Sequence, residues 1–152
     1  MQTGDKKLPA SEKLLVKRLT ENAILPARAS PGAAGYDISS NIRVSIAPYG
    51  KAIVSTGIAV TAPPGTYGRL APRSGFTWNH HTSLEAGVCD RDYTGELKVV
   101  LFNHSDATVL IEAGMRIAQL ILERVATPEV EEVTDLEPSA RGAGGFGSTG
   151  ST

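Results

Sequence analysis

The chain has 152 residues, which is enough for one domain with a sizeable buried core. Its 15 Lys and Arg against 16 Asp and Glu leave a formal net charge of −1, so it lacks the basic excess typical of proteins that grip nucleic acid by its phosphates. Hydrophobic residues at 41% are ordinary for a soluble globular protein, and no apolar run approaches the ~18 residues of a transmembrane helix.

Residues 1–13 are expected to form a flexible segment ahead of the folded domain. Lys6 and Lys7 lie there without an apolar stretch after them, so the segment does not have the composition of a secretory signal peptide. The single cysteine, Cys89, excludes an internal disulfide, and no Cys/His cluster has the spacing of a zinc site. We therefore expect a soluble protein of a reducing compartment, cytoplasmic or nuclear and not secreted.

Short apolar segments punctuated by glycine and proline predict β-strands. In the segment 41–47, Ile42, Val44 and Ile46 alternate with polar residues, which is the pattern of a half-buried strand. Apolar and β-branched residues predict further strands in the segments 51–61, 96–102 and 109–111.

The segment 116–125 is compatible with a helix or a strand, and the spacing of its neighbours, about 8–12 residues, favours a strand. A short helix is predicted at 74–81, with Ser74 as its N-cap. The fold class is therefore all-β, a sandwich or barrel with one short helix, over residues 14–137. From residue 138 the composition changes to Gly, Ser and Thr, which predicts a flexible arm over 138–152.

Residues 72–75, Pro-Arg-Ser-Gly, are the first candidate functional segment. At the start of a short helix they would bind an anion, because Arg73 adds charge, backbone N–H groups point at the ligand and Gly75 allows close approach. The alternative is a turn in which Ser74 only caps the helix, which is the commoner use of such residues.

Residues 87–95 are predicted to form a β-hairpin with Asp90, Asp92 and Tyr93 at its head. A carboxylate held there is suited to be a general base for water, and a tyrosine is suited to pack on a sugar or a base. The alternative is that the aspartates only form the turn and that Tyr93 is only a packed strand residue.

Residues 141–150 are the third candidate segment. Their closely spaced glycines, with Arg141 and the hydroxyls of Ser148 and Thr149, would wrap a polyphosphate through backbone amides. Phe146 stands among glycines where no core can bury it, so a stacking partner would explain it. The spacing is not that of a P-loop, and by composition alone a disordered tail is the simpler interpretation.

Together and in this order, these segments resemble the five motifs of the homotrimeric dUTPase family. The resemblance covers the chain from about Leu14 to its C-terminus, and the third and fifth matches are highly specific as a pair. In family order the motifs are matched by residues 34–38 (AGYDI), 72–75, 87–95, 116–120 (RIAQL) and 141–150.

This resemblance implies a fold, an assembly and a reaction. The fold is a jelly-roll-like β-barrel with a glycine-rich C-terminal arm. The assembly is a homotrimer with shared active sites, in which the arm of one subunit closes over a site built by the other two. The reaction is hydrolysis of dUTP to dUMP and pyrophosphate by Mg²⁺-assisted attack of water on the α-phosphorus, which limits uracil incorporation into DNA and supplies dUMP for thymidylate synthesis. Neither nucleic acid nor a membrane is expected as a partner.

The resemblance also assigns roles within the folded domain. Asp90 would be the catalytic general base, and Tyr93 would pack on the deoxyribose and exclude a 2′-hydroxyl. The backbone around Gly87 and Val88 would read the uracil edge, and Asp37 would act near the Mg²⁺ through water. The phosphate chain would be held by Arg73, Ser74, Gly75 and Gln119.

In the arm, Arg141, Ser148 and Thr149 would close over the γ-phosphate beside Gly147, and Phe146 would stack above the uracil. The chain departs from the family pattern by substitution at Phe76, Thr77, Trp78, Cys89 and Thr94. Because the catalytic aspartate and tyrosine are retained, we expect activity.

Two alternatives remain at this point. A dCTP deaminase, or a bifunctional deaminase–dUTPase, has a related fold and needs a glutamate to activate water at the pyrimidine ring. Glu85, just before the predicted hairpin, does not have the placement expected for that role, and the arm favours the hydrolase. A catalytically silent binding domain is disfavoured by the intact Asp90, Tyr93 and arm.

Overall fold

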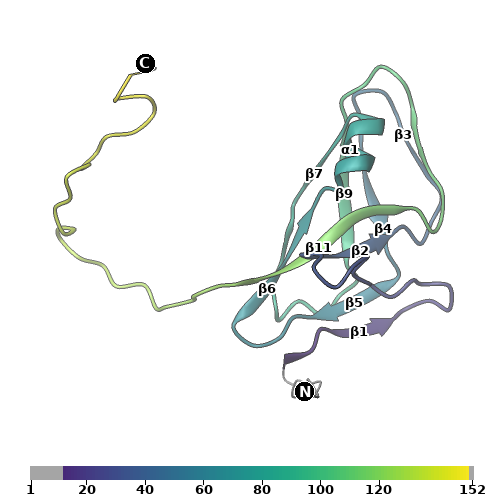
Figure 1. Cartoon of the computed structure of the whole chain (residues 1–152), viewed down its shortest axis with the longest axis horizontal. Coiled ribbons are helices and arrows are strands. Elements are labelled where there is room, and N and C mark those ends of the chain that lie inside the picture. The colour runs from purple at the N-terminus through teal and green to yellow at the C-terminus, as the bar shows by residue number, and fades with distance from the viewer. Residues whose placement is uncertain (1–11, 151–152) are drawn as a thin grey trace, which may run out of the picture.

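A computed structural model of the protein describes residues 12–150. The segment expected to be flexible, residues 1–13, lies almost entirely outside this range. Within it, strands make up most of the folded body, with one short helix and a long C-terminal extension (Figure 1). In chain order the elements are β1 (Leu15–Arg18), β2 (Gly35–Ser39), β3 (Val44–Ile46), β4 (Lys51–Ser55), β5 (Ile58–Thr61), β6 (Thr66–Ala71), α1 (Ser74–His80), β7 (Thr82–Glu85), β8 (Val88–Cys89), β9 (Lys98–Asn103), β10 (Val109–Ile111) and β11 (Arg116–Arg124).

The strands form four sheets, all with antiparallel pairing. A four-stranded sheet has the order β2-β11-β6-β8, and a three-stranded sheet has the order β4-β9-β7. Two smaller sheets pair β1 with β5 and β10 with β3. The expected all-β, jelly-roll-like barrel with one short helix is confirmed, although the pairing does not close the barrel continuously.

The core lies between the sheets and is filled by branched aliphatic side chains. β9 illustrates the period of two, because Val99 and Leu101 are buried while Lys98 is exposed. The side chains of Ile117 and Leu120 on β11 are fully buried. Each such residue contributes on the order of 1.5–3 kcal/mol of hydrophobic stabilisation to the body that supports the site.

Two of the predicted strands are shorter in the structure. The segment 51–61 is divided into β4 and β5 at Gly57, whose φ of 70° takes the chain into the left-handed region and interrupts the strand. In the segment 41–47 only β3 is paired, because Ile42 belongs to a turn closed by the Ser40 hydroxyl, which accepts the Ile42 N–H at 3.2 Å.

The ambiguous segment 116–125 is a strand, as its neighbours' spacing favoured. β11 pairs with β2 along one edge and with β6 along the other, so it lies inside the four-stranded sheet. A strand paired on both edges has its backbone N–H and C=O groups hydrogen-bonded within the sheet. This tertiary pairing, and not the local sequence pattern, determines that the segment is a strand and not a helix.

Beyond β11 the chain leaves the body. The Val125 N–H donates to the Gly65 carbonyl at 3.1 Å, and the residues from 126 to 143 are exposed. Figure 1 shows this extension running away from the sheets to the C-terminus. The departure begins well before residue 138, and its apolar residues Val130 and Leu136 are 99% and 85% exposed.

The helix α1 has 7 residues and packs Phe76 into the core. Nothing helical in residues 12–150 has the length and apolar character required to cross a membrane.

Candidate active site

The first half of the candidate site lies where β2, β11 and the end of β6 are neighbours. Strand register puts Asp37 of β2 opposite Gln119 of β11, and Gln119 opposite Ala71 of β6. Three strands from distant parts of the sequence thereby present adjacent side chains just before α1. They surround a hollow of about 210 Å³ that is lined by Ala29, Ala33, Gly35, Asp37, Arg73, Ser74, Gly75 and Gln119. The structure therefore brings the predicted phosphate-binding residues and the predicted metal-side aspartate together.

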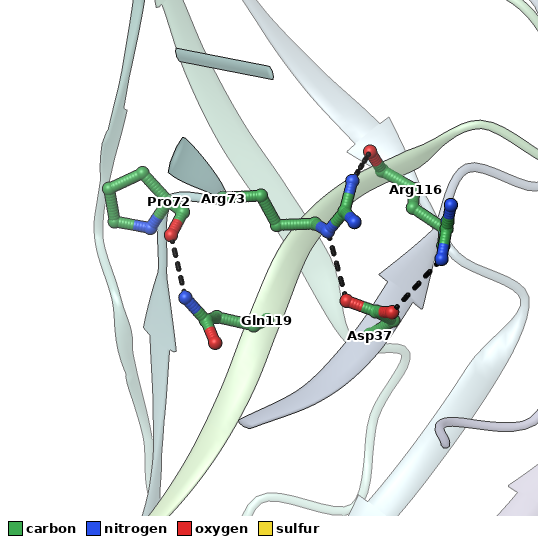
Figure 2. Close-up of polar contacts among 5 residues, drawn as sticks. All are labelled: Asp37, Pro72, Arg73, Arg116 and Gln119. Atoms are coloured by element: carbon green, nitrogen blue, oxygen red, sulfur yellow. Dashed lines mark hydrogen bonds and ion pairs between the residues drawn. The ribbon is translucent and has the colours of Figure 1, made fainter. Parts of the chain in front are cut away.

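Asp37 joins two arginines, Arg73 in this hollow and Arg116 in the neighbouring one (Figure 2). Its Oδ1 lies 2.9 Å from Arg73 Nε, and its Oδ2 lies 3.4 Å from Arg116 Nη1. Arg73 Nη1 also donates to the Arg116 carbonyl oxygen at 3.2 Å. Because Asp37 and Arg73 are mostly buried, with 20% and 27% of their side chains exposed, this contact is shielded from solvent and fixes the direction of the guanidinium.

Arg116 is a site residue that sequence reasoning missed. It belongs to the fourth motif, but no role was assigned to it. It pairs with Ser39, which follows Asp37 by two positions on β2 and so shares its face of the sheet. Pairing of the first and fourth motifs in adjacent strands is the signal that would have found it.

Gln119 is held by its neighbours. Its Nε2 donates to the Pro72 carbonyl oxygen at 2.9 Å, which ties β11 to the chain entering α1 (Figure 2). Gly35 lies beside the Gln119 side chain, and a Cβ there would overlap the Gln119 Cβ at 2.9 Å. The glycine of the first motif is therefore explained by close packing against the glutamine of the fourth.

The helix start differs from the expectation that Ser74 is the N-cap. Arg73 occupies the cap position with extended φ and ψ of −93° and 131°, and Ser74 is the first helical residue. In the part of the chain that the structure describes, no side chain caps this helix. The Arg73 guanidinium has only donors and pairs with Asp37, and the uncapped first N–H groups of α1 remain available to a ligand. A Cβ at Gly75 would meet nothing within 4 Å, which leaves open space beside them.

The substitutions in α1 have separate places. Phe76 is 6% exposed and lies 4.6 Å from the His80 ring between ring centroids. Trp78 is 84% exposed and points away from the core. The departure from the family pattern at Phe76 is thus a change in the core, and it leaves Arg73 and Gly75 in place.

The second half of the candidate site is the loop after β8. The predicted β-hairpin over 87–95 is wrong, because β8 pairs with β6 whereas β9 pairs with β4 and β7. The loop crosses between two sheets, and the preference of its residues for turns does not reveal which strands flank it. A hollow of about 240 Å³ lies against it, lined by Leu70, Ala86, Val88, Cys89, Asp90, Tyr93, Glu96, Leu97, Lys98 and Val100.

Asp90 and Tyr93 lie together in this loop. The Tyr93 N–H donates to the Asp90 carbonyl oxygen at 3.1 Å, and the Tyr93 hydroxyl donates to the Glu96 carbonyl oxygen at 2.8 Å. Asp90 is exposed, and Tyr93 is 46% exposed. Both side chains are therefore accessible to a ligand, and Tyr93 is not a packed strand residue.

Gly87 and Val88 precede this loop, and Cys89 supports it from inside. The Leu70 N–H donates to the Gly87 carbonyl at 2.7 Å, and a Cβ at Gly87 would lie 2.6 Å from the Leu70 carbonyl oxygen, so only glycine permits this approach. Cys89 is 7% exposed, and burial, followed by the charge of Asp90, raises the pKa of its thiol. Cys89 is therefore a small residue of the core.

The two halves of the site lie far apart in one chain. Cys89 pairs with Gly68, so Asp90 comes beside Tyr67 at the start of β6, whereas Arg73 follows the end of that strand. At about 3.3 Å per residue, the main chains of Asp90 and Arg73 are roughly 20 Å apart. A single chain does not bring the predicted base to the predicted phosphate-binding residues.

The arm residues lie away from both halves. Arg141 Nε donates to the Gly144 carbonyl at 2.7 Å, and the Ser148 N–H donates to the Gly145 carbonyl at 3.0 Å. Phe146 is fully exposed, and the neighbouring Gly147, Ser148 and Thr149 are exposed as well. The structure therefore does not bring the predicted arm residues to the hollows of their own body (Figure 1).

A third group of polar side chains lies between the two halves. Glu123 of β11 accepts hydrogen bonds from the Tyr67 hydroxyl and from Arg69 Nε, each at 2.7 Å. The bond from Tyr67, and then that from Arg69, holds the pKa of Glu123 below its ordinary value, and the bond to Glu123 raises the pKa of Tyr67. This cluster borders a wider hollow of about 670 Å³ that also contains Asp90 and Arg91.

Within residues 12–150, no group of three or more His, Cys, Asp or Glu side chains is placed to hold a metal ion. Asp37 has both carboxylate oxygens directed at arginines. Any ion at this site would have to be held largely by a ligand and by water.

Comparison with known proteins agrees with the motifs. The dUTPase family model matches residues 21–150. Deoxyuridine 5′-triphosphate nucleotidohydrolase of Paramecium bursaria Chlorella virus 1 is 55% identical over 137 residues, which is 90% of this chain and 97% of that protein. The enzyme of the same name from Solanum lycopersicum is 53% identical over 135 residues, 89% of this chain and 80% of that protein.

Solved structures lead to the same family. Staphylococcus bacteriophage 80alpha dUTPase with dUPNHPP is 35% identical, has a TM-score of 0.86, and is matched over 91% of this chain and 99% of its own. A mutant of the dUTPase from phage phi11 of S. aureus, described with a structural Mg(II) ion, is 32% identical, with a TM-score of 0.78 over 83% of this chain and 99% of its own. With its motifs, fold and relatives in agreement, the chain belongs to the dUTPase family and is a dUTP-hydrolysing enzyme.

Proposed function

We propose that the protein hydrolyses dUTP to dUMP and pyrophosphate at sites shared between three copies of the chain, by Mg²⁺-assisted attack of water on the α-phosphorus. The observation that carries the shared site is the roughly 20 Å between Asp90 and Arg73, both of which the reaction needs. In the cell this reaction would limit uracil incorporation into DNA and supply dUMP for thymidylate synthesis. The enzyme would act in a cytoplasmic or nuclear compartment, where the buried thiol of Cys89 stays reduced.

The hollow at α1 is suited to the triphosphate. Arg73 provides a directed positive charge, and Ser74 and Gly75 provide uncapped backbone N–H groups at a helix start. Gln119 borders the same space. The charge that develops on the departing pyrophosphate is stabilised best by groups that are already oriented, and the Asp37 carboxylate keeps Arg73 oriented.

The loop after β8 is suited to the nucleoside and to the attacking water. Asp90 is the proposed general base, since an exposed carboxylate accepts a proton from water that it orients. Tyr93, beside it, would lie flat on the deoxyribose and leave no room for a 2′-hydroxyl. The backbone of Gly87 and Val88 would hydrogen-bond the uracil edge at the neighbouring hollow.

The residues present fit an Mg²⁺ ion that is carried mainly by the substrate. Mg²⁺ prefers octahedral oxygen ligands and usually keeps several waters, so one or two carboxylates and phosphate oxygens suffice. Asp37 lies beside the phosphate hollow and, because its oxygens contact arginines, would reach the ion through water. When bound, the ion would neutralise charge on the phosphate oxygens.

A homotrimer would complete each site with parts of different chains. One subunit would contribute Arg73 and its hollow, a second would contribute Asp90 and Tyr93, and the arm of the third would close over the substrate. The exposed Val130 and Leu136 of the extension support assembly, since a neighbouring subunit would cover their apolar surface. Arg141, Gly147, Ser148 and Thr149 would then contact the γ-phosphate, and Phe146 would stack on the uracil.

The deaminase alternative has no support in the geometry. Glu85 is exposed at the end of β7, and it is not among the residues that line the hollow beside Asp90. A glutamate in that position does not face a pyrimidine bound there.

Subunit complementation tests the shared site. Arg73→Ala and Asp90→Asn chains, each inactive alone, are co-expressed with different affinity tags and the mixed oligomers are isolated. A cyclic trimer with one chain of one kind and two of the other keeps one intact junction of three, so the isolated mixed trimers should have about a third of the wild-type activity. The control pairs Arg73→Ala with Gln119→Ala, which damage the same half and should not complement. Inactive mixed oligomers of the first pair, or a fully active monomer by light scattering, would refute the shared site.

A further inference from the structure

We propose that Ser55 and Glu96 form a clasp that positions the Tyr93 ring, so that Ser55, which lies outside the family motifs, helps to set discrimination between deoxyribose and ribose. The inference rests on the proposed packing of Tyr93 against the sugar. It adds that the ring can exclude a 2′-hydroxyl only if the ring itself is held firmly in position.

The first contact ties the ring to the backbone. The Tyr93 hydroxyl donates to the Glu96 carbonyl oxygen at 2.8 Å. Nearly half of Tyr93 is exposed, so few packing contacts restrain its rotamer. This hydrogen bond therefore supplies a restraint at the far end of the ring, where a small rotation moves the ring face most.

Gly95 makes this contact possible. A Cβ at Gly95 would lie 2.7 Å from the Tyr93 hydroxyl oxygen and 2.8 Å from Cζ, which is closer than real Cβ contacts allow. The ring thus lies directly across the backbone of residue 95. Any larger residue there would displace the ring.

The acceptor carbonyl is itself fixed. In the trans peptide that joins Glu96 to Leu97, the C=O and the N–H point in opposite directions. The Leu97 N–H donates to the Ile58 carbonyl at 2.8 Å, so the Glu96 carbonyl is directed away from β5 and toward Tyr93.

The Glu96 side chain adds the second anchor. The Ser55 hydroxyl lies 2.8 Å from Oε1 and 2.7 Å from Oε2, so its proton is shared by both carboxylate oxygens. Ser55 is the last residue of β4 and pairs with Lys98 of β9, which makes it part of the barrel wall. A hydrogen bond to a charged acceptor is stronger than a neutral one, so the clasp holds the loop bearing Tyr93 to that wall.

The test compares kcat/KM for dUTP and for UTP in five variants. Ser55→Ala removes the clasp and should lower the dUTP/UTP ratio several-fold, up to about tenfold for the loss of a charge-assisted hydrogen bond. The change should come mainly from better use of UTP, with kcat for dUTP little altered. Ser55→Thr keeps the hydroxyl and should restore the ratio. Ser45→Ala, at an exposed strand serine of β3, is the matched control and should behave as wild type.

Tyr93→Ala separates the clasp from the proposed function. If Tyr93→Ala lowers the ratio and Ser55→Ala does not, the clasp is refuted while the role of Tyr93 stands. If Tyr93→Ala leaves the ratio unchanged, both the sugar contact and the clasp are refuted. Glu96→Gln, which keeps an acceptor for Ser55 without the charge, should give a smaller loss than Ser55→Ala, and an equal or larger loss would show that Glu96 acts in another way.

Discussion

The carboxylate of Asp37 meets the guanidinium of Arg73 at 2.9 Å, and its second oxygen faces Arg116. One acidic side chain on β2 therefore contacts Arg73 in the proposed phosphate hollow and Arg116 in the neighbouring hollow. We expect this arrangement to give Asp37 a part in binding the triphosphate that is separate from any contact with a metal ion.

Asp37→Asn should raise KM for dUTP and lower kcat/KM on the order of tenfold, because both guanidinium groups lose their charged partner. The melting temperature should change little, since partly exposed ion pairs are worth about 0–1 kcal/mol. Steady-state kinetics at several Mg²⁺ concentrations separates the two roles. If the apparent affinity for Mg²⁺ is unchanged, Asp37 acts only by orienting the arginines. If KM for dUTP is unchanged, Asp37 does not have that orienting role.

Asp90→Asn should reduce kcat by ~10²–10⁴-fold, the usual contribution of a positioned general base. The substitution keeps the shape of the side chain, so a non-hydrolysable dUTP analogue should bind nearly as well as to the wild-type protein. Asp92→Asn, in the same exposed turn, is the matched control and should keep most of its turnover. Comparable losses in both variants would mean that the loop conformation matters and that Asp90 is not the base.

Removal of residues 141–152 should leave the melting temperature nearly unchanged and should strongly weaken catalysis. In the described part of this segment nearly all residues are exposed, so the core loses little. Phe146→Ala alone should lose only the stacking contribution, on the order of 1–3 kcal/mol, as for other contacts between a base and an aromatic ring. Calorimetry and kinetics on both variants check this prediction. A wild-type value of kcat/KM after truncation would show that the arm is a tail without a part in catalysis.

Glu123→Gln should lower the melting temperature near neutral pH and should have less effect in acid. The pKa of Glu123 is lowered in the folded protein by Tyr67 and Arg69, so its charged form stabilises the fold above the ordinary carboxyl pKa of 4.5. That stabilisation is lost as the pH falls from 4.5 through the lowered value. Glu112→Gln, which breaks a more exposed pair with Arg43, is the control and should show almost no difference. A gap between Glu123→Gln and wild type that stays constant from neutral pH into strong acid would contradict this account.

Much of the architecture could be predicted from local pattern. The strand at 116–125 followed from the spacing of its neighbours, and α1 was expected within one residue of its observed end. The cap was wrong because Arg73, and not Ser74, takes the extended position at the helix start, with its side chain drawn to Asp37. This contact is made with Asp37, which is distant in sequence, so a local sequence pattern does not reveal it.

The candidate site residues could be named from the family motifs, but their arrangement in space could not be predicted. The loop after β8 has the composition of a hairpin, yet its flanking strands join different sheets. Arg116 was missed because its partner on β2 is set by strand register. Only the structure relates Asp90 to Arg73, since their separation depends on which end of β6 each one follows.

The length of β6 has a consequence for how the enzyme can change. Asp90 comes beside the start of this strand and Arg73 follows its end, so the length of the strand sets the distance between the two halves of the candidate site. A substitution in β6 does not alter the distance between the two halves, because the number of residues in the strand stays the same. Adding or removing a pair of residues would shift the halves by about 7 Å while keeping the strand's faces. In a symmetric assembly the same displacement would recur at every site at once, so selection should reject insertions and deletions in β6.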